Sequence, residues 1–256
     1  MFNRYAILAT AFMGLILFSL AQGGDFKKQQ QKFPRVRKAR ENVGSALAAL
    51  FDSLNIKYPP HEIYLRAFKY ERHLEIWCRA NDTAKFMMIK SYPFTAFSGN
   101  PGPKRYQGDL QIPEGIYHID RFNPASKYHL SLGINYPNKS DRIRKTRPDP
   151  GGDIFIHGNE VTIGCIPIGD DAIEELYILA VDARDNGRKK IPAHIYPYDF
   201  TDKETDEKLS DLYKADTALL DFWNELRPFC SYFNTNKSLP KIRIDETGKY
   251  NLAPEQ

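Results

Sequence analysis

The sequence predicts an α+β fold, a β-rich body with helices before, inside and after it. Apolar and polar residues alternate over 63–68, 74–80 and 85–91, which is typical of three consecutive strands in a β-meander. Apolar residues recur with helical spacing over 36–54 and 206–226. The chain has 256 residues, 42% of them hydrophobic and 27% charged. That length and composition suit one folded domain with a sizeable core.

The first half of the chain gives helix, strand and loop signals in turn. Residues 22–34 are polar and rich in Gln and Lys, which predicts a flexible lead-in. In the helix over 36–54, apolar residues recur at intervals of four and three from Val43, and Pro59-Pro60 follows as a stop signal. After the meander we expect a Gly- and Pro-rich loop and two more strands, at 99–115, 116–121 and 128–135.

The second half starts with a polar loop, 138–152, that carries Arg142, Arg144, Lys145 and Arg147. It is either a lid that reads anions or an ordinary solvated loop. A helix is expected from its predicted N-cap, Asp170, to Asn186-Gly187. We expect Pro228 to stop the amphipathic helix over 206–226. The remaining predicted elements are a strand at 191–196 and a terminal hairpin at 241–250.

The N-terminus is typical of an export signal. Arg4 provides a positive flank, 5–20 is an almost unbroken apolar run, and Ser19 and Ala21 suit cleavage after Ala21. The run is shorter than the roughly 20 residues that span a bilayer comfortably, with an uncleaved anchor as the alternative. We therefore expect residues 1–21 to be a signal peptide and the protein to be exported to the periplasm or cell envelope. It would touch the membrane only through this segment, if uncleaved.

The net charge of +4 is mild and does not indicate a nucleic-acid partner, and none is expected. Basic residues do cluster early in the chain: Lys27, Lys28, Lys32, Arg35, Arg37, Lys38 and Arg40. The solvated start of a helix explains such a cluster. Contact with an anionic wall polymer or membrane surface is the alternative.

The chain has three cysteines, an odd number, so at least one thiol should stay free in an exported protein. Cys78 shares the alternation of Leu74 and Ile76, which predicts burial on a strand. Cys230 follows Pro228, and a disulfide between Cys78 and Cys230 is a possible pairing. Only the surroundings of Cys165 indicate a reactive thiol.

The most informative segment runs from 153 to 167. A short apolar strand delivers His157, and seven residues separate it from Cys165. The thiol is mostly protonated at neutral pH, and an imidazole can take that proton and later return it to a leaving amine. Gly158 and Gly164 permit turns that a side chain would obstruct. The amides of Gly158, Gly164 and Cys165 are therefore candidates for stabilising an oxyanion.

The same segment allows other interpretations. Asn159, Glu160 or a backbone carbonyl can orient His157, and the sequence does not choose among them. A buried, inert cysteine is an alternative to catalysis, and metal binding is another. Two ligands do not make a zinc site, and the chain has no C-x-x-C motif or second histidine at ligand spacing. We expect no metal and no cofactor.

Beyond these local signals, the chain resembles the L,D-transpeptidase family with a YkuD-type catalytic domain. The resemblance rests on His157-Gly158 followed by Thr162-Ile163-Gly164-Cys165, and it extends over roughly 60–200. Blocks upstream are similar to its YafK-like branch: Leu74-Glu75-Ile76-Trp77, Gly102-Pro103-Lys104-Arg105, 108–117 and 128–133. Ile163 stands where many members have a second histidine, and Pro167 where many have Arg or Asn.

The resemblance implies a β-rich, sandwich-like catalytic body of mixed sheets over 59–200. A lead-in and an N-terminal helix at 22–58 would precede it, and a C-terminal helical extension at 201–256 would pack on it. Cys165 would attack the carbonyl at the L-centre of the third residue of a peptidoglycan stem peptide, with His157 as base and then acid. Attack on the thioester by an amine gives transpeptidation. Attack by water gives carboxypeptidase activity or release of a wall-attached protein.

The resemblance also suggests substrate-binding residues. Lys104 and Arg105 are candidates for binding stem carboxylates, with a structural salt bridge as the alternative. Tyr128 and His129 are candidates for lining the cleft, although His129 can equally be a strand residue facing solvent. Because the second histidine is absent, a non-enzymatic wall-binding protein with a degenerate site is the competing hypothesis.

Overall fold

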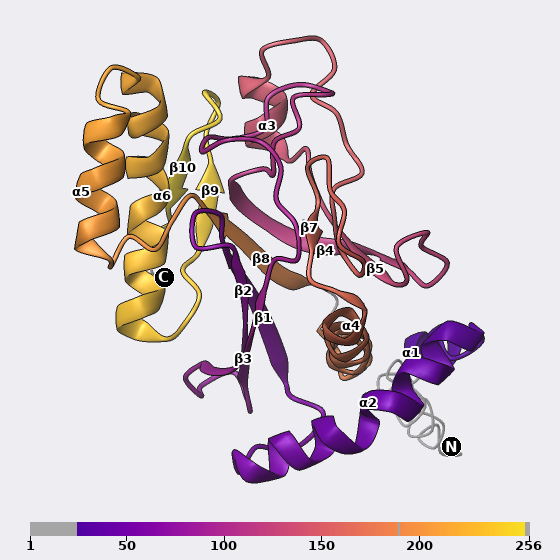
Figure 1. Ribbon diagram of the computed structural model, residues 1–256. Coiled ribbons are helices and arrows are strands. Elements are labelled where there is room, and N and C mark those ends of the chain that lie inside the picture. The colour runs from indigo at the N-terminus through magenta and orange to yellow at the C-terminus, as the bar shows by residue number, and fades with distance from the viewer. Residues whose placement is uncertain (1–24, 189, 254–256) are drawn as a thin grey trace, which may run out of the picture.

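The computed structural model describes residues 25–188 and 190–253 (Figure 1). The predicted signal peptide at 1–21 lies outside these residues. The helices are α1 (Asp25–Gln30), α2 (Pro34–Ser53), α3 (Lys139–Arg144), α4 (Asp170–Asp185), α5 (Lys203–Leu212) and α6 (Thr217–Asn236). The strands are β1 (Glu62–Phe68), β2 (His73–Arg79), β3 (Met87–Pro93), β4 (Gly115–Asn123), β5 (Ser131–Ile134), β6 (Phe155–His157), β7 (Ile166–Pro167), β8 (Ile191–Tyr196), β9 (Ile242–Ile244) and β10 (Tyr250–Leu252). The predicted α+β class is confirmed.

Eight strands form one mixed sheet in the order β3-β2-β1-β8-β4-β5-β6-β7. The predicted meander supplies one end, because β1, β2 and β3 pair antiparallel in succession. β1 pairs parallel with β8, and β6 pairs parallel with β7. Figure 1 shows a strongly curled sheet, in which the meander and β4–β5 run in different directions. The sandwich-like body is thus one curled sheet, and β6–β7 form the end opposite the meander.

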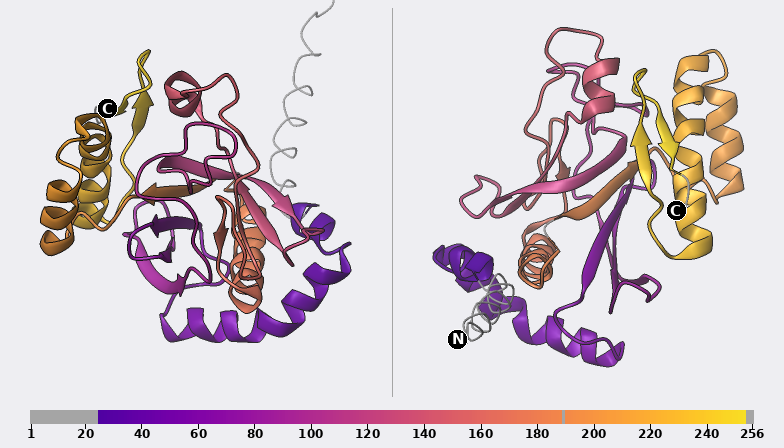
Figure 2. Two further views of the ribbon diagram at one scale, coloured as in Figure 1. Left: turned by 45° about the horizontal axis from the view of Figure 1, so that its top comes forward. Right: turned by 180° about the vertical axis from the view of Figure 1, so that it is seen from behind.

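Helix α4 lies at the centre of the main core. It contacts β1, β5 and β6 as well as α1 and α2. The apolar residues that it buries are Ile173, Leu176, Tyr177, Ile178, Leu179, Ala180, Val181 and Ala183. Helix α2 buries residues three and four apart, namely Val36, Ala39, Val43, Leu47 and Phe51. The sheet therefore has α4, backed by α1 and α2, on one side, and α5–α6 lie on the other side in both views of Figure 2.

Helix α1 occupies part of 22–34, so the prediction of a flexible lead-in there is wrong. Phe26 packs edge-on against Phe122, with ring centroids 4.9 Å apart. The Arg184 guanidinium lies 4.0 Å from the Phe26 centroid. Lys27 pairs at 3.0 Å with Asp182, whose side chain is fully buried. These long-range contacts stabilise the segment, and its polar composition does not reveal them.

The C-terminal segment forms two helices rather than the single helix predicted over 206–226. Helix α6 begins behind Asp216, whose side chain accepts a hydrogen bond from the Leu219 amide. Pro228 does not stop α6, which continues to Asn236. An interior proline costs about 3 kcal/mol, but each large apolar side chain that is fully buried contributes about 1.5–3 kcal/mol. Helix α6 buries several of these: Phe222, Trp223, Leu226, Phe229 and Phe233.

A buried ion pair connects the sheet, the 99–115 loop and α6. Lys69, 1% exposed, pairs with Glu114, 0% exposed, at 3.0 Å. The Lys69 ammonium also donates to three backbone carbonyls of the loop. Glu114 accepts hydrogen bonds from the Gly102 amide and from the indole N–H of Trp223, at 2.8 and 2.9 Å. This Lys69–Glu114–Trp223 cluster attaches the C-terminal extension to the body.

Two further predictions are corrected, and the pairing of Cys78 with Cys230, which the sequence left open, is decided. The strand expected over 128–135 is only β5, because His129 has a left-handed backbone with φ of 66°. Gly169, not Asp170, is the N-cap of α4, and the Asp170 carboxylate accepts the Asn159 amide instead. Cys78 and Cys230 are both buried and free, so they form no disulfide.

Among the described helices, none has the length and apolar character needed to cross a membrane.

Candidate active site

Two short parallel strands bring His157 and Cys165 together. Strand β6 ends at His157, and β7 begins directly after Cys165. Ile156 pairs with Ile166 in register, and both side chains are buried. Neighbouring strands lie about 4.8 Å apart. The turn at 158–164 therefore returns the chain so that the thiol and the imidazole line one cavity.

Gly164 and Thr162 shape that turn. Gly164 has φ of +132°, and a Cβ there would lie 3.0 Å from the Gln111 carbonyl oxygen, so glycine is required. The Thr162 hydroxyl accepts hydrogen bonds from the amides of Gly164 and Cys165, at 3.1 and 2.8 Å. It donates to the Cys165 carbonyl at 2.8 Å. Thr162 thus holds the backbone of the cysteine, a role that the sequence motif contained but did not indicate.

The amides predicted to form an oxyanion hole are already hydrogen-bonded. Those of Gly164 and Cys165 donate to Thr162. The Gly158 amide donates to the carbonyls of Tyr128 and Leu130, at 3.1 and 3.3 Å. In this conformation the three amides are therefore not free to receive an oxyanion, because local turn bonds use all three donors.

His157 is 1% exposed, and its ring is oriented by the backbone. Its Nδ1 lies 2.5 Å from the Gly158 carbonyl oxygen. A carbonyl only accepts, so Nδ1 carries the proton and Nε2 is the basic nitrogen of the neutral ring. Burial lowers the pKa of His157, opposed by the bond to Gly158. Of the orienting groups that the sequence left open, the backbone carbonyl is the one in contact.

Cys165 is half-buried and rests as a thiol. Its Sγ accepts the Phe155 amide at 3.4 Å and donates to the Asp153 carbonyl at 3.6 Å. Burial raises the pKa of Cys165 above its ordinary value, opposed by the Phe155 amide. Within the described part of the chain, no hydrogen bond joins Sγ to His157. The pair therefore rests as a neutral thiol and a neutral imidazole, not as a preformed ion pair.

The cavity at this pair measures about 200 Å³. Its lining contains no Asp, Glu, Lys or Arg, and consists of Tyr128, His157, Val161, Thr162, Ile163 and Cys165. Ile163 is 79% exposed and Val161 51%, so they form an apolar rim. The Tyr128 ring lies over His157, with centroids 4.8 Å apart and planes tilted by 33°. The structure therefore places Tyr128 in the cleft, and its contact with substrate stays a prediction.

The other predicted substrate contacts lie elsewhere. Lys104 is 4% exposed and pairs with Asp109 at 2.6 Å inside the 99–115 loop. Arg105 lies 5.0 Å from the Phe222 centroid of α6. His129 turns away from the cavity to Glu174 of α4, with 2.7 Å between Nε2 and Oε1. The structure therefore does not bring these three residues to the cavity, because each side chain is held by a structural partner.

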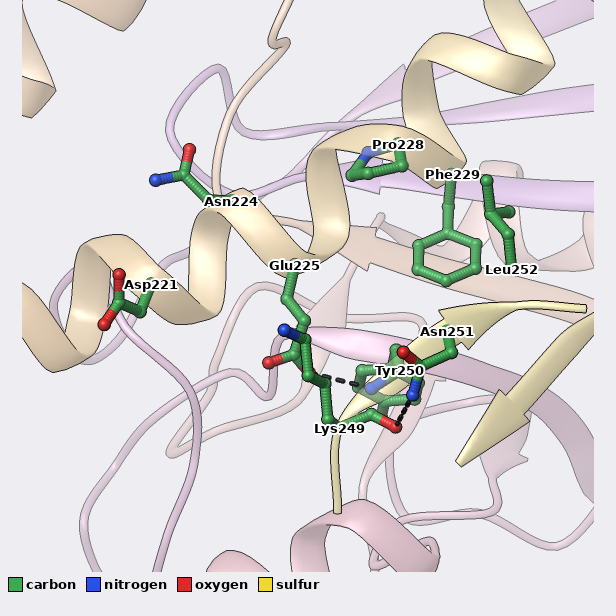
Figure 3. A pocket seen from close by; sticks show the side chains of 9 residues that line it. All are labelled: Asp221, Asn224, Glu225, Pro228, Phe229, Lys249, Tyr250, Asn251 and Leu252. Carbon is green, nitrogen blue, oxygen red and sulfur yellow. Dashed lines mark hydrogen bonds between the residues drawn. The ribbon is translucent and has the colours of Figure 1, made fainter. Parts of the chain in front are cut away.

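A larger cavity, about 570 Å³, lies between α6 and β10 (Figure 3). Its walls include Pro228 and Phe229 of the helix and Leu252 of the hairpin. None of the residues around Cys165 lines it. Over residues 25–188 and 190–253, no group of three or more His, Cys, Asp or Glu side chains is arranged to hold a metal ion.

Known proteins similar to this chain agree on one family. The family model of the L,D-transpeptidase catalytic domain (YkuD) matches residues 71–190. YafK of Escherichia coli K12, itself named as a candidate L,D-transpeptidase, is 30% identical over 190 residues. That match covers 73% of this chain and 72% of YafK, and the same holds for YafK of strain O157:H7.

Two solved structures are more distantly similar. One is the helical cell shape determining protein Pgp2 from Campylobacter jejuni, with 20% identity, a TM-score of 0.43, and coverage of 72% of this chain and 73% of that one. The other is Bd1075 from Bdellovibrio bacteriovorus, with 20% identity, a TM-score of 0.39, and coverage of 66% and 59%. On the family model and the extent of the match to YafK, the chain belongs to the L,D-transpeptidase family with a YkuD-type catalytic domain.

Proposed function

We propose that this protein is an exported cysteine acyltransferase or hydrolase that acts on the stem peptides of peptidoglycan. Cys165 is the nucleophile, and His157 is the general base and acid. The observation that carries this proposal is the single cavity lined by both side chains, with Nδ1 of the imidazole bonded to Gly158 and Nε2 left basic. Membership of the L,D-transpeptidase family supports the peptidoglycan substrate.

The first half of the reaction forms a thioester. The Cys165 thiol gives its proton to Nε2 of His157, and Sγ bonds to the carbonyl carbon at the L-centre of the third stem residue. The tetrahedral adduct then collapses. The C–N bond breaks, and the imidazolium returns the proton to the leaving amine. A neutral resting pair suits this sequence, because the base is unprotonated when the substrate arrives.

The second half consumes the thioester. An amine or a water molecule gives a proton to His157 and bonds to the acyl carbon, and the thiol leaves with the returned proton. An amine acceptor makes a cross-link, whereas water shortens the stem or frees a wall-linked group. The apolar rim of Val161 and Ile163 limits water near the acyl group, but it does not by itself choose the acceptor.

Tyr128 is the donor that we assign to the oxyanion of the tetrahedral adducts. Its ring lines the cavity, and no hydrogen bond of its hydroxyl occurs among the described residues. The nearby amides of Gly164 and Cys165 are bonded to Thr162. A phenol directed at a developing negative charge stabilises it without being ionised itself.

A non-enzymatic wall-binding protein is the second candidate. The observation that favours it is the hydrogen bonding of all three backbone amides that were predicted to stabilise an oxyanion, together with Ile163 at the place of a second histidine. It requires Cys165 to be dispensable, and wall binding to survive its replacement.

Incubation with purified muropeptides, followed by mass spectrometry, tests both candidates. The wild type is compared with Cys165→Ala and with Cys230→Ala, which removes a buried thiol outside the cavity. Dimers indicate transfer, and shortened stems indicate hydrolysis; either product should vanish with Cys165→Ala and persist with Cys230→Ala. Equal product from wild type and Cys165→Ala contradicts the proposed mechanism. No product, with wall binding retained by Cys165→Ala, supports the second candidate.

A further inference from the structure

Arg35, in the first turn of α2, reaches away from its own helix. Its Nη1 donates to the Ser126 carbonyl at 2.6 Å and also to the His129 carbonyl. A cation in the first turn meets the positive end of the helix dipole, so this position is unfavourable within α2 alone. Charge-assisted bonds to two carbonyls offset that cost. The Arg35 side chain therefore stabilises the turn at 126–129, called the 126–129 corner below, more than it stabilises its own helix.

The corner that Arg35 bridges has a strained backbone. His129 has φ of 66°, a left-handed conformation that non-glycine residues adopt only when their surroundings enforce it. Its carbonyl is bonded to Arg35, and its imidazole to Glu174 of α4. Glu174 also accepts the side-chain amide of Asn42 in α2 at 2.8 Å. Helix α2 thus holds the corner directly and through α4.

The same corner carries the ring that covers the general base. The Tyr128 carbonyl accepts the Gly158 amide at 3.1 Å, and the Tyr128 ring lies over His157. His157 is only 1% exposed. The titratable side chains that face its ring are Tyr128 and Cys165, and Asp170 of α4 lies against the Gly158 backbone. A displacement of the corner would expose the imidazole.

We propose that Arg35 is a positioning residue of the active site. By bridging the carbonyls of Ser126 and His129, it holds the Tyr128 ring over His157. The inference rests on the proposed role of His157 as base. It makes α2, which lies outside the matched residues 71–190, a part of the catalytic unit.

The test compares Arg35→Gln with Arg37→Gln. Arg37 is in the same helix and donates to the carbonyls of Gln31 and Lys32, away from the cavity. An NMR titration of His157 should give a higher pKa in Arg35→Gln than in the wild type, because the ring loses its cover. On muropeptides kcat should fall roughly tenfold with little change in KM, since a small misplacement of a catalytic group is costly. Arg37→Gln should change neither quantity.

Two additions make the outcome decisive. In a Tyr128→Ala background, Arg35→Gln should have no further effect on kcat, because its action passes through Tyr128. Arg35→Lys, which keeps the charge but shortens the side chain and replaces the guanidinium, should be intermediate and is the variant to use if Arg35→Gln does not fold. An unchanged His157 pKa, or effects that multiply in the double variant, overturns the proposal. The NMR titration needs no turnover. A wild type inactive on muropeptides would therefore refute the proposed function, and the His157 pKa in Arg35→Gln would still decide whether Arg35 positions the ring.

Discussion

Two polar clusters in this protein differ in how completely their groups are bonded. In the Lys69–Glu114–Trp223 cluster, the ammonium meets three carbonyls and a carboxylate, which in turn binds an amide and an indole. At the Cys165–His157 pair, the sulfur contacts are long, 3.4 and 3.6 Å, and Nε2 of His157 has no bond among the described residues. The first cluster holds elements together, whereas the second leaves groups available to a substrate.

Burial alone does not make this distinction. His194 is 3% exposed, similar to His157, and burial lowers its pKa to about 3. His194 lies on β8, and its Nδ1 is 3.0 Å from the Tyr64 hydroxyl of β1 and 3.2 Å from the Tyr196 hydroxyl of β8. Of these two histidines, it is His157 that adjoins a cavity lined by a thiol. A free basic nitrogen beside a nucleophile, rather than a shifted pKa, marks the candidate site.

The largest expected effect comes from Cys165→Ala. Removing the proposed nucleophile should lower kcat/KM by at least about 10³-fold, while the free energy of unfolding should change by only about 0.5 kcal/mol, because the side chain is half-buried and weakly bonded. Muropeptide kinetics and urea unfolding measure the two quantities. A large loss of stability in this variant would mean that the site is structural, like the Lys69 cluster.

Glu114→Gln should lower the stability of the protein and leave the reactivity of Cys165 unchanged, the reverse of what is expected for Cys165→Ala. It leaves the buried Lys69 ammonium without a carboxylate, which should destabilise the protein by about 3–5 kcal/mol. Under conditions where the variant is still folded, alkylation of Cys165 by iodoacetamide should stay close to the wild-type rate. Urea unfolding and the alkylation rate, measured on one preparation, check both parts. If Glu114→Gln left the free energy of unfolding unchanged but slowed the alkylation of Cys165, the two clusters would not differ in the way described.

The pH dependence of kcat/KM should report His157 on the acid side. Protonated imidazole cannot accept the thiol proton, so activity should fall as pH falls, by roughly tenfold per pH unit below the midpoint. Burial lowers the pKa of His157, so that midpoint should lie below about 6.5, the ordinary value for histidine. Tyr128→Ala should raise it by exposing the ring. A midpoint at or above the ordinary value in the wild type would contradict the buried-base interpretation.

Trp223→Phe should destabilise the protein less than Glu114→Gln does. It keeps most of the apolar packing but removes the indole N–H that donates to Glu114, leaving a buried carboxylate oxygen without that partner. We expect a loss of about 1–3 kcal/mol in the free energy of unfolding. Tyr213→Phe, at a neighbouring ring 5.5 Å from Trp223, is a matched control that leaves Glu114 untouched. Equal losses in both variants would argue for packing rather than the hydrogen bond.

Local patterns were sufficient for several elements. The meander, α2, α4, β8 and the terminal hairpin follow from periodicity and turn residues, because each has one buried face. The elements that were predicted wrongly depend on contacts with residues far away in the sequence. Helix α1 depends on Phe122 and Asp182, and α6 continues through Pro228 because its buried face packs on the sheet. The corner at His129 depends on Arg35 and Glu174.

The sequence by itself determined the fold class, the family, and the pairing of a thiol with a base within one short segment. Only the tertiary structure decided which polar groups are available. It bonds His157 to the Gly158 carbonyl, bonds the amides of Gly164 and Cys165 to Thr162, and places Lys104 on Asp109. The physical reason is that periodicity reports which face of an element is buried, whereas each hydrogen-bond partner is selected by three-dimensional proximity.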